Sequence, residues 1–182
     1  MLEEKTVYIL LTRSSTFFSR LIHLATDDCY THVSIGLDGP SGPFYSFARR
    51  YERFALPAGL VRETVGSQVH ATRRQIPCCL YELKVPAAVY QRLRRRLNDM
   101  YAQKEQYHYN LLGLLACYFN HPLPRARHYF CSQFAASLLE YCGAVELGKT
   151  PDLIRPADFC QIPHFRPVYQ GELGQIPQAV PA

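Results

Sequence analysis

The sequence predicts one α+β domain in which an antiparallel β-sheet packs against helices. Short β-rich runs fill the first half of the chain, whereas helical periodicities dominate the second half. Two neighbouring runs flank a turn rich in glycine and proline, as in a β-hairpin. The 182 residues contain no internal repeat and no Gly/Ser-rich linker. We therefore expect a single domain over residues 1–170 and a C-terminal tail over residues 171–182.

The expected strands follow one another from the N-terminus. Residues 6–12 (TVYILLT) form a short apolar run that is typical of a buried strand. Residues 31–37 (THVSIGL) and 44–50 (FYSFARR) alternate between two faces and flank the turn sequence DGPSGP, so we expect them to pair as a hairpin. Two more strands are expected at residues 59–65 and 79–85.

Helices are expected around these strands. Residues 14–16 (SST) can cap a helix that follows the first strand. Pro86 opens the longest helix, and residues 110–119 and 129–142 form two more, the last of them ended by Gly143. The apolar stripe of the longest helix consists of Val89, Leu93, Leu97 and Met100. Its other faces carry Arg92, Arg94, Arg95 and Arg96, which we interpret as a solvated surface.

The composition is that of a globular protein, with 48% hydrophobic and 19% charged residues. A net charge of +5 is too small by itself to indicate nucleic acid or an anionic membrane as a partner. No apolar run approaches the roughly 18 residues of a membrane span, and the N-terminal segment MLEEKTVYILLTRSS lacks a signal-peptide cleavage site. We therefore expect a cytoplasmic protein with no nucleic-acid partner and no stable membrane insertion.

Cys131 is the strongest candidate for chemistry. It falls in the first turn of the helix expected over residues 129–142, and no Ser, Thr, Asp or Asn stands just before it to cap that helix. A thiolate at this place would accept hydrogen bonds from the free backbone N–H groups, and the helix dipole would lower its pKa. The alternative is a small buried hydrophobic residue, which is what most free cysteines are.

A thiolate nucleophile needs a base within hydrogen-bond reach, and His32 is the expected one. It stands on a predicted strand beside Ser34 and Gly36, whose small side chains leave room for a partner and a substrate. His128 is a second candidate, because it precedes Cys131 by three residues.

No cofactor and no metal site are expected. The chain has seven histidines and seven cysteines, but they show none of the paired-cysteine, HxxxH or HExxH spacings of zinc sites. The glycines are scattered and form no phosphate-binding loop, and no GxSxG motif of serine hydrolases occurs.

Six segments carry a family resemblance: THVSIGLD, FYSFARR, GLVRET, YHYNLLGLL, YFCSQFAASLL and IRPADF, spread over roughly residues 5–160. Together they resemble the circularly permuted NlpC/P60 (papain-like) cysteine hydrolase family, and within it the YiiX/YaeF-like branch. In that family a strand histidine precedes a helix cysteine, and lecithin:retinol acyltransferase-like enzymes share this permuted order. His32 and Cys131 match the family's base and nucleophile.

The resemblance implies a papain-like α+β fold and a thiol hydrolase that cleaves amide bonds of a small acylated or peptide substrate through a thioester on Cys131. At the family's third position, often a glutamate in this branch, the sequence places Ser46. Its hydroxyl could orient the imidazole of His32 but could not stabilise imidazolium as a carboxylate would; it could equally bond to the backbone. Tyr107 and Tyr109 could line the site as substrate-binding residues, or be buried tyrosines with satisfied hydroxyls.

Two other functions share the same residues. An acyltransferase would use the same pair of Cys131 and His32 but would exclude water from the acyl-enzyme. A catalytically silent binding module would keep both residues in its core. The sequence does not decide between them, and it leaves the oligomeric state open.

Overall fold

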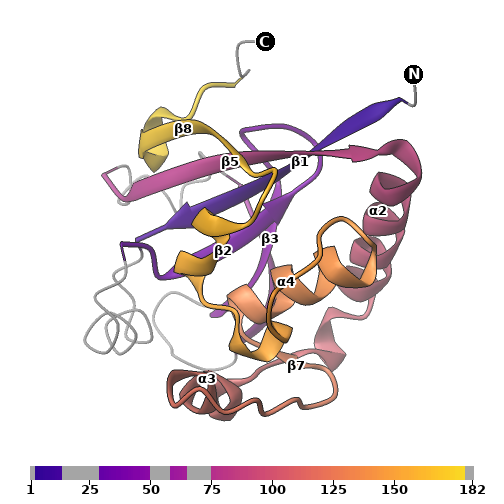
Figure 1. The fold of residues 1–182 in the computed structure, drawn as a ribbon, viewed down its shortest axis with the longest axis vertical. Helices are drawn as coiled ribbons and strands as arrows, with labels where there is room; N and C mark the ends of the chain where they lie inside the picture. The colour runs from indigo at the N-terminus through magenta and orange to yellow at the C-terminus, as the bar shows by residue number, and fades with distance from the viewer. Residues whose placement is uncertain (1–2, 14–28, 50–57, 65–74, 179–182) are drawn as a thin grey trace.

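A computed structural model describes residues 3–13, 29–49, 58–64 and 75–178, which form an α+β structure (Figure 1). Six antiparallel strands make one sheet in the order β4-β3-β2-β1-β5-β8. The strands are β1 Glu4–Thr12, β2 His32–Gly36, β3 Phe44–Arg49, β4 Ala58–Glu63, β5 Pro77–Pro86 and β8 Arg166–Glu172. The helices are α2 Ala87–Ala102, α3 Leu111–Tyr118 and α4 Cys131–Tyr141, and a separate parallel pair is formed by β6 His108–Tyr109 and β7 His128–Tyr129. The expected α+β class with an antiparallel sheet is confirmed.

The central strand β1 explains the apolar run near the N-terminus. It pairs with β2 on one side and with β5 on the other. Val7, Ile9 and Leu11 face one apolar core and Leu10 faces a second core on the opposite side of the sheet. Burial on both faces accounts for the lack of alternation in the sequence of this strand. The expected hairpin is also confirmed, because β2 pairs antiparallel with β3.

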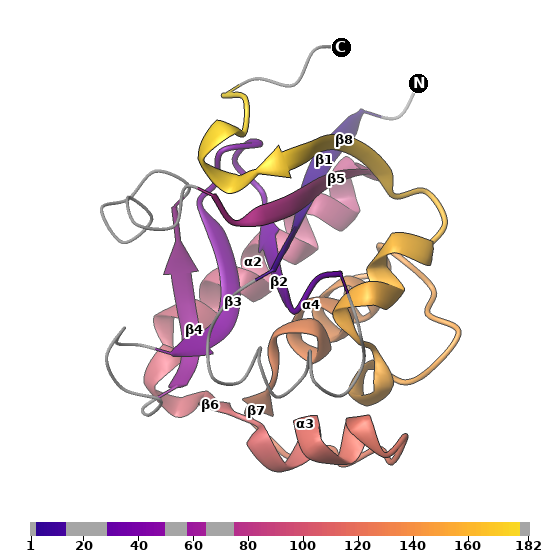
Figure 2. The ribbon, with the colours of Figure 1, turned by 90° about the vertical axis from the view of Figure 1, so that its left-hand side faces the viewer.

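Helices α2 and α4 lie together on one face of the sheet (Figure 2). The predicted stripe of α2 is buried as expected, and Tyr90 joins it, donating a hydrogen bond from its hydroxyl to Leu37 O at 2.6 Å. Arg92 is exposed, as the interpretation of the arginine face as solvated predicts. Its guanidinium donates from Nε (3.2 Å) and Nη2 (2.9 Å) to Cys142 O, where α4 ends, because the last carbonyls of a helix lack partners within it.

The C-terminal segment belongs to the same sheet. Strand β8 pairs with β5 and runs to Glu172, so the expected boundary at residue 170 falls inside a strand. Beyond it, Leu173 and Ile176 are buried in the apolar core that β8 covers. The expected helix after residues 14–16 lies outside the described residues, whereas the helices expected at 110–119 and 129–142 are α3 and α4. Gly143 ends α4 with a φ of 70°, as predicted.

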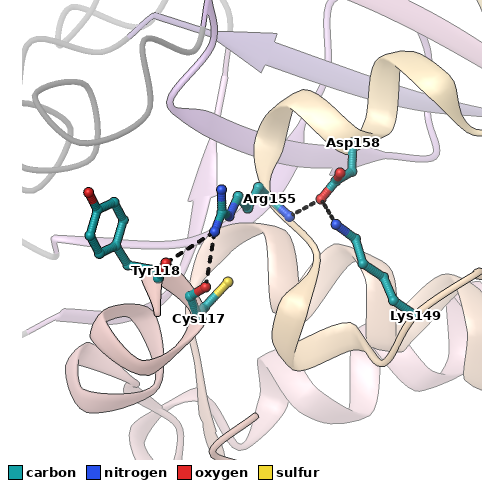
Figure 3. Close-up of polar contacts among 5 residues, drawn as sticks. All are labelled: Cys117, Tyr118, Lys149, Arg155 and Asp158. Carbon is teal, nitrogen blue, oxygen red and sulfur yellow. Dashed lines mark hydrogen bonds and ion pairs between the residues drawn. The ribbon is translucent and has the colours of Figure 1, made fainter. Parts of the chain in front are cut away.

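Both ends of α3 are held by side chains. At its start, the buried Asn110 accepts a hydrogen bond from Gly113 N at 3.0 Å. At its end, Arg155 Nη2 donates to Cys117 O and Tyr118 O, each at 3.2 Å (Figure 3). The arginine is in turn positioned through its backbone N–H, which donates to Asp158 Oδ2 at 2.6 Å. None of the helices in the described part of the chain is long and apolar enough to cross a membrane.

Gly113 allows the close approach of the capping side chain. A Cβ atom added at this position would lie 2.1 Å from Asn110 Nδ2. We expect Gly113→Ala to break the cap and lower the melting temperature by roughly 4–8 °C, since overpacking with loss of a cap costs about 2 kcal/mol. Thermal unfolding checks this. Gly148→Ala is the matched control, because a Cβ there meets nothing within 4 Å; equal stability of the two variants would contradict the cap's importance.

Candidate active site

Cys131 is the first residue of α4, and its side chain is 3% exposed. The N-cap residue is Phe130, whose side chain makes no capping hydrogen bond, as expected from the sequence. Gln133 satisfies part of this helix start by accepting a hydrogen bond from Phe130 N to Oε1 at 3.3 Å. The thiol itself hydrogen-bonds to the backbone of Ser132 and Val33, which places it between the helix start and strand β2.

His32 opens β2 and hydrogen-bonds to the side chain of Cys131. Burial raises the pKa of the Cys131 thiol. The hydrogen bond and the positive charge of His32 lower it, as do the backbone bonds to Val33 and Ser132. Together these effects outweigh burial, so the pKa of the thiol lies below its usual value. Burial lowers the pKa of His32, yet the carboxylate of Glu63 and the bonds to Cys131 raise it to about 10. The pair therefore favours a thiolate beside an imidazolium.

The other buried cysteines show the opposite behaviour. Five of the seven cysteines are buried. In four of them burial raises the pKa, to about 12 for Cys78, and no imidazole compensates; these four are Cys78, Cys79, Cys117 and Cys142. Cys131 is the buried thiol whose pKa is lowered. The interpretation of Cys131 as a mere small hydrophobic residue does not explain this difference.

Glu63 provides the carboxylate of the site. It lies at the end of β4, and its Oε2 is 3.5 Å from His32 Nε2. The same oxygen accepts a hydrogen bond from Ser34 Oγ at 2.9 Å. His32 Nε2 is buried and has no hydrogen-bond partner within the described residues, so the Glu63 carboxylate faces it as an ion-pair partner. Ser34 thus holds the carboxylate on the imidazole of His32.

Ser46 does not take the place that the sequence suggested. Its hydroxyl is fully buried and donates to Val33 O at 2.5 Å. A serine hydroxyl has one proton to donate, and here the backbone of β2 receives it. Because Glu63 faces His32 instead, the expectation that Ser46 orients His32 is corrected: Ser46 ties β3 to the strand that carries the histidine.

The two tyrosines of the YHYNLLGLL segment have different surroundings. Tyr107 is buried in an aromatic cluster, with ring centroids 6.5 Å from Phe47 and 6.3 Å from Tyr129, which is a core position. Tyr109 interacts electrostatically with the thiol: burial raises its pKa well above the usual range, and the negative charge of Cys131 raises it further. Tyr109 therefore keeps its hydroxyl proton, and of the two tyrosines it is the one whose pKa responds to the charge of Cys131.

The second histidine considered as a base is directed elsewhere. His128 Nδ1 lies 2.8 Å from Ala126 O, and its ring packs against His108 at a centroid distance of 5.3 Å. Of the two candidate bases, only His32 hydrogen-bonds to Cys131. The described residues contain no cluster of three or more His, Cys, Asp or Glu side chains suited to a metal ion.

A polar network fixes the first turn of α4. Gln133 Nε2 donates to Asp152 Oδ1 at 2.7 Å, and Gln133 Oε1 accepts from Asn110 Nδ2 at 3.4 Å. These contacts join the start of α4 to the start of α3 and to the 3₁₀ helix Pro151–Leu153. Buried polar groups with satisfied partners define one arrangement of the backbone. The helix end that presents Cys131 is thereby held in place by side chains from two neighbouring segments.

Sequence reasoning missed Glu63, Ser34, Gln133 and Asn110. A signal for Glu63 was present: within the expected strands 31–37, 44–50 and 59–65 it is the single carboxylate. Comparisons of the chain with protein-family models, with curated proteins and with solved structures found no significant match. The family resemblance therefore rests on the quoted segments alone.

Proposed function

We propose that this protein is a cysteine-dependent hydrolase of amide bonds with a papain-like, circularly permuted NlpC/P60 fold. The observation that carries the proposal is the pairing of Cys131 with His32, since it lowers the pKa of this thiol alone among the buried cysteines. A thiolate stabilised at a helix N-terminus by an imidazolium is the activated nucleophile that acyl transfer needs.

The proposed reaction has two halves. Cys131 Sγ attacks the carbonyl carbon of the amide, and the resulting tetrahedral oxyanion collapses to a thioester as the C–N bond breaks. The imidazolium of His32 gives its proton to the leaving amine. In the second half, neutral His32 takes a proton from water, whose oxygen attacks the thioester carbonyl. The carboxylic acid leaves, and Cys131 is again a thiolate beside protonated His32.

Other residues of the site support these steps. Glu63 stabilises the imidazolium form of His32, and Ser34 keeps the Glu63 carboxylate in position. The oxyanion meets the Cys131 backbone N–H at the helix start, where no carbonyl within the helix accepts that hydrogen. Tyr109 is suited to be a second donor, because its hydroxyl remains protonated and its pKa responds to the charge of the thiol.

Trapping of an acyl-enzyme tests this proposal. The protein is mixed with p-nitroanilides of a fatty acid and of a dipeptide, quenched in acid and weighed intact by mass spectrometry. We expect one acyl group on Cys131, release of the aniline, and no adduct on Cys131→Ala. Cys160→Ala is the matched control, because Cys160 is exposed and unconnected with the site.

The same experiment separates the alternatives. Transfer of the acyl group to an added amine or alcohol, with little free acid, would identify an acyltransferase. Absence of any adduct, together with unchanged ligand binding by Cys131→Ala, would contradict the hydrolase and favour a binding module.

A further inference from the structure

Exposed apolar side chains gather on α3 and the loop that follows it. Six large hydrophobic residues are strongly exposed in the described structure, and only Tyr141 lies outside this region. The other five form what we call the α3 surface: Leu112, Leu115, Tyr118, Phe119 and Leu123. Phe119 is the most exposed of them, at 76%. Exposed apolar side chains gathered on one short segment in this way mark a site of interaction.

The position of the α3 surface suits a partner that approaches from outside. Helix α3 lies at the end of the molecule opposite both chain termini (Figures 1 and 2). Its inner side is fixed by the buried residues Gly113 and Cys117. Leu112 and Leu115 project from the remaining side, with exposures of 56% and 41%. The helix is therefore anchored to the protein while its apolar outer side is free to contact a partner.

The charge around this surface is positive. Residues 106–139 contain no Asp or Glu, and the loop after α3 presents exposed Arg125 and Arg127. The guanidinium of Arg155 lies at the C-terminal end of α3 (Figure 3). Two acids of neighbouring segments are already engaged: Asp158 pairs with Lys149 at 2.8 Å and with Arg155 N, and Asp152 accepts from Gln133.

We propose that the α3 surface docks the protein onto an anionic lipid bilayer, with the apolar side chains entering the interface and Arg125 and Arg127 contacting headgroups. A short apolar helix bordered by basic residues is suited to the boundary between headgroups and acyl chains. A second copy of this chain fits less well. An isologous contact would bring the arginines of both copies together, and a helix about 12 Å long is small for the roughly 800 Å² that a stable dimer buries per partner.

The docking surface is tied to the helix that carries Cys131. Asn110, which caps α3, donates to Gln133 in the first turn of α4. A bilayer bound at α3 would thus lie on the side of the molecule where α4 begins. The proposal itself does not depend on the reaction, because it rests on exposure and charge alone.

Tryptophan substitution gives a direct measurement, because the chain has no Trp. Phe119→Trp and Tyr141→Trp place a single fluorophore at two positions of nearly equal exposure, 76% and 75%. Each is mixed with vesicles of phosphatidylcholine alone and of an equimolar mixture with phosphatidylserine. We expect a blue shift, and quenching by brominated acyl chains, for Trp at position 119 on the anionic vesicles. Trp at position 141 should show neither effect.

Vesicle sedimentation then measures the contributions of single residues. We expect Phe119→Ser to weaken binding to the anionic vesicles about tenfold, as for loss of one buried aromatic side chain. Arg125→Gln should weaken it roughly fivefold and reduce its salt dependence. Tyr141→Ser is the matched control and should bind like the unmodified protein.

Three results would overturn the proposal. One is equal binding of Phe119→Ser and Tyr141→Ser. Another is equal affinity of the protein for phosphatidylcholine and for the anionic vesicles. The third is a dimer that Phe119→Ser converts to a monomer while the unmodified protein binds no vesicles, which would assign the α3 surface to a second copy of this chain.

Discussion

Replacement of His32 by alanine should abolish the selective alkylation of Cys131 at neutral pH. In the unmodified protein the hydrogen bond and the positive charge of His32 outweigh burial and lower the pKa of this thiol. Without the imidazole, the backbone bonds to Val33 and Ser132 remain, but the larger contributions that oppose burial are gone. We then expect burial to dominate, as it does at Cys79 and Cys142, where the pKa is raised. With a pKa at or above its ordinary value, the thiolate fraction at neutral pH is at most a few per cent. We expect the alkylation rate of Cys131 to fall about 10- to 100-fold.

The measurement is iodoacetamide labelling at limiting reagent over a pH series, with adducts assigned to each cysteine by mass spectrometry. Cys29 and Cys160 are exposed and serve as internal references for reagent access. His128→Ala is the control, because that histidine bonds to Ala126 O and not to the thiol. If Cys131 keeps its rate in His32→Ala, or if His128→Ala lowers it equally, the pairing of Cys131 with His32 is not what activates the thiol.

The elements of this fold could be read from local patterns, because each strand and helix carries its own periodicity. The stripe of α2 and the hairpin of β2 and β3 followed from residues that are close in the sequence. Strand β8, at the edge of the sheet, could not be predicted in this way. Its sequence, RPVYQGE, shows no clear apolar alternation. The strand is defined by its pairing with β5, 84 to 95 residues earlier in the chain, which no local pattern reveals.

The residues of the candidate site also fall into those that local sequence predicts and one that it does not. Cys131 and His32 were found because their local settings, a helix start without a cap and a strand with small neighbours, are visible in the sequence. The third group was misplaced because it depends on how side chains cross a twisted sheet. Ser46 stands on the strand next to His32, yet its hydroxyl bonds to the backbone of Val33. Glu63, one strand further away, reaches the imidazole.

Substitution of Glu63 by glutamine should narrow the pH range of activity from the alkaline side. Burial lowers the pKa of His32, and the Glu63 carboxylate and Cys131 together raise it to about 10. Without the carboxylate the pKa of His32 falls, so the alkaline limit of the active form moves to lower pH. The acid limit stays in place, because His32 is still protonated at acid pH and still lowers the pKa of Cys131. We expect kcat/KM at neutral pH to fall about 10- to 100-fold.

The stability of the folded protein should also depend on the protonation of His32, and it should decrease as pH rises. A raised pKa in the folded state means that protonated His32 contributes its full stabilisation below its ordinary pKa of about 6.5, and that this is lost as pH rises through about 10. Glu63→Gln should therefore destabilise the protein at neutral pH and much less above the pKa of His32. Melting temperatures of both proteins across the pH series measure this difference.

Ser46→Ala is the control that distinguishes the two assignments of the third residue. It removes the donor to Val33 O and leaves that buried carbonyl without this partner, so it should lower stability by about 1–3 kcal/mol. The pH limits of activity should stay in place, because the charge facing His32 is unchanged. If Ser46→Ala moves those limits and Glu63→Gln does not, the serine orients His32. If instead Glu63→Gln moves a pH limit of activity and Ser46→Ala does not, the carboxylate of Glu63 acts on the imidazole. A purely structural residue would alter the melting temperature and leave the pH limits of activity unchanged.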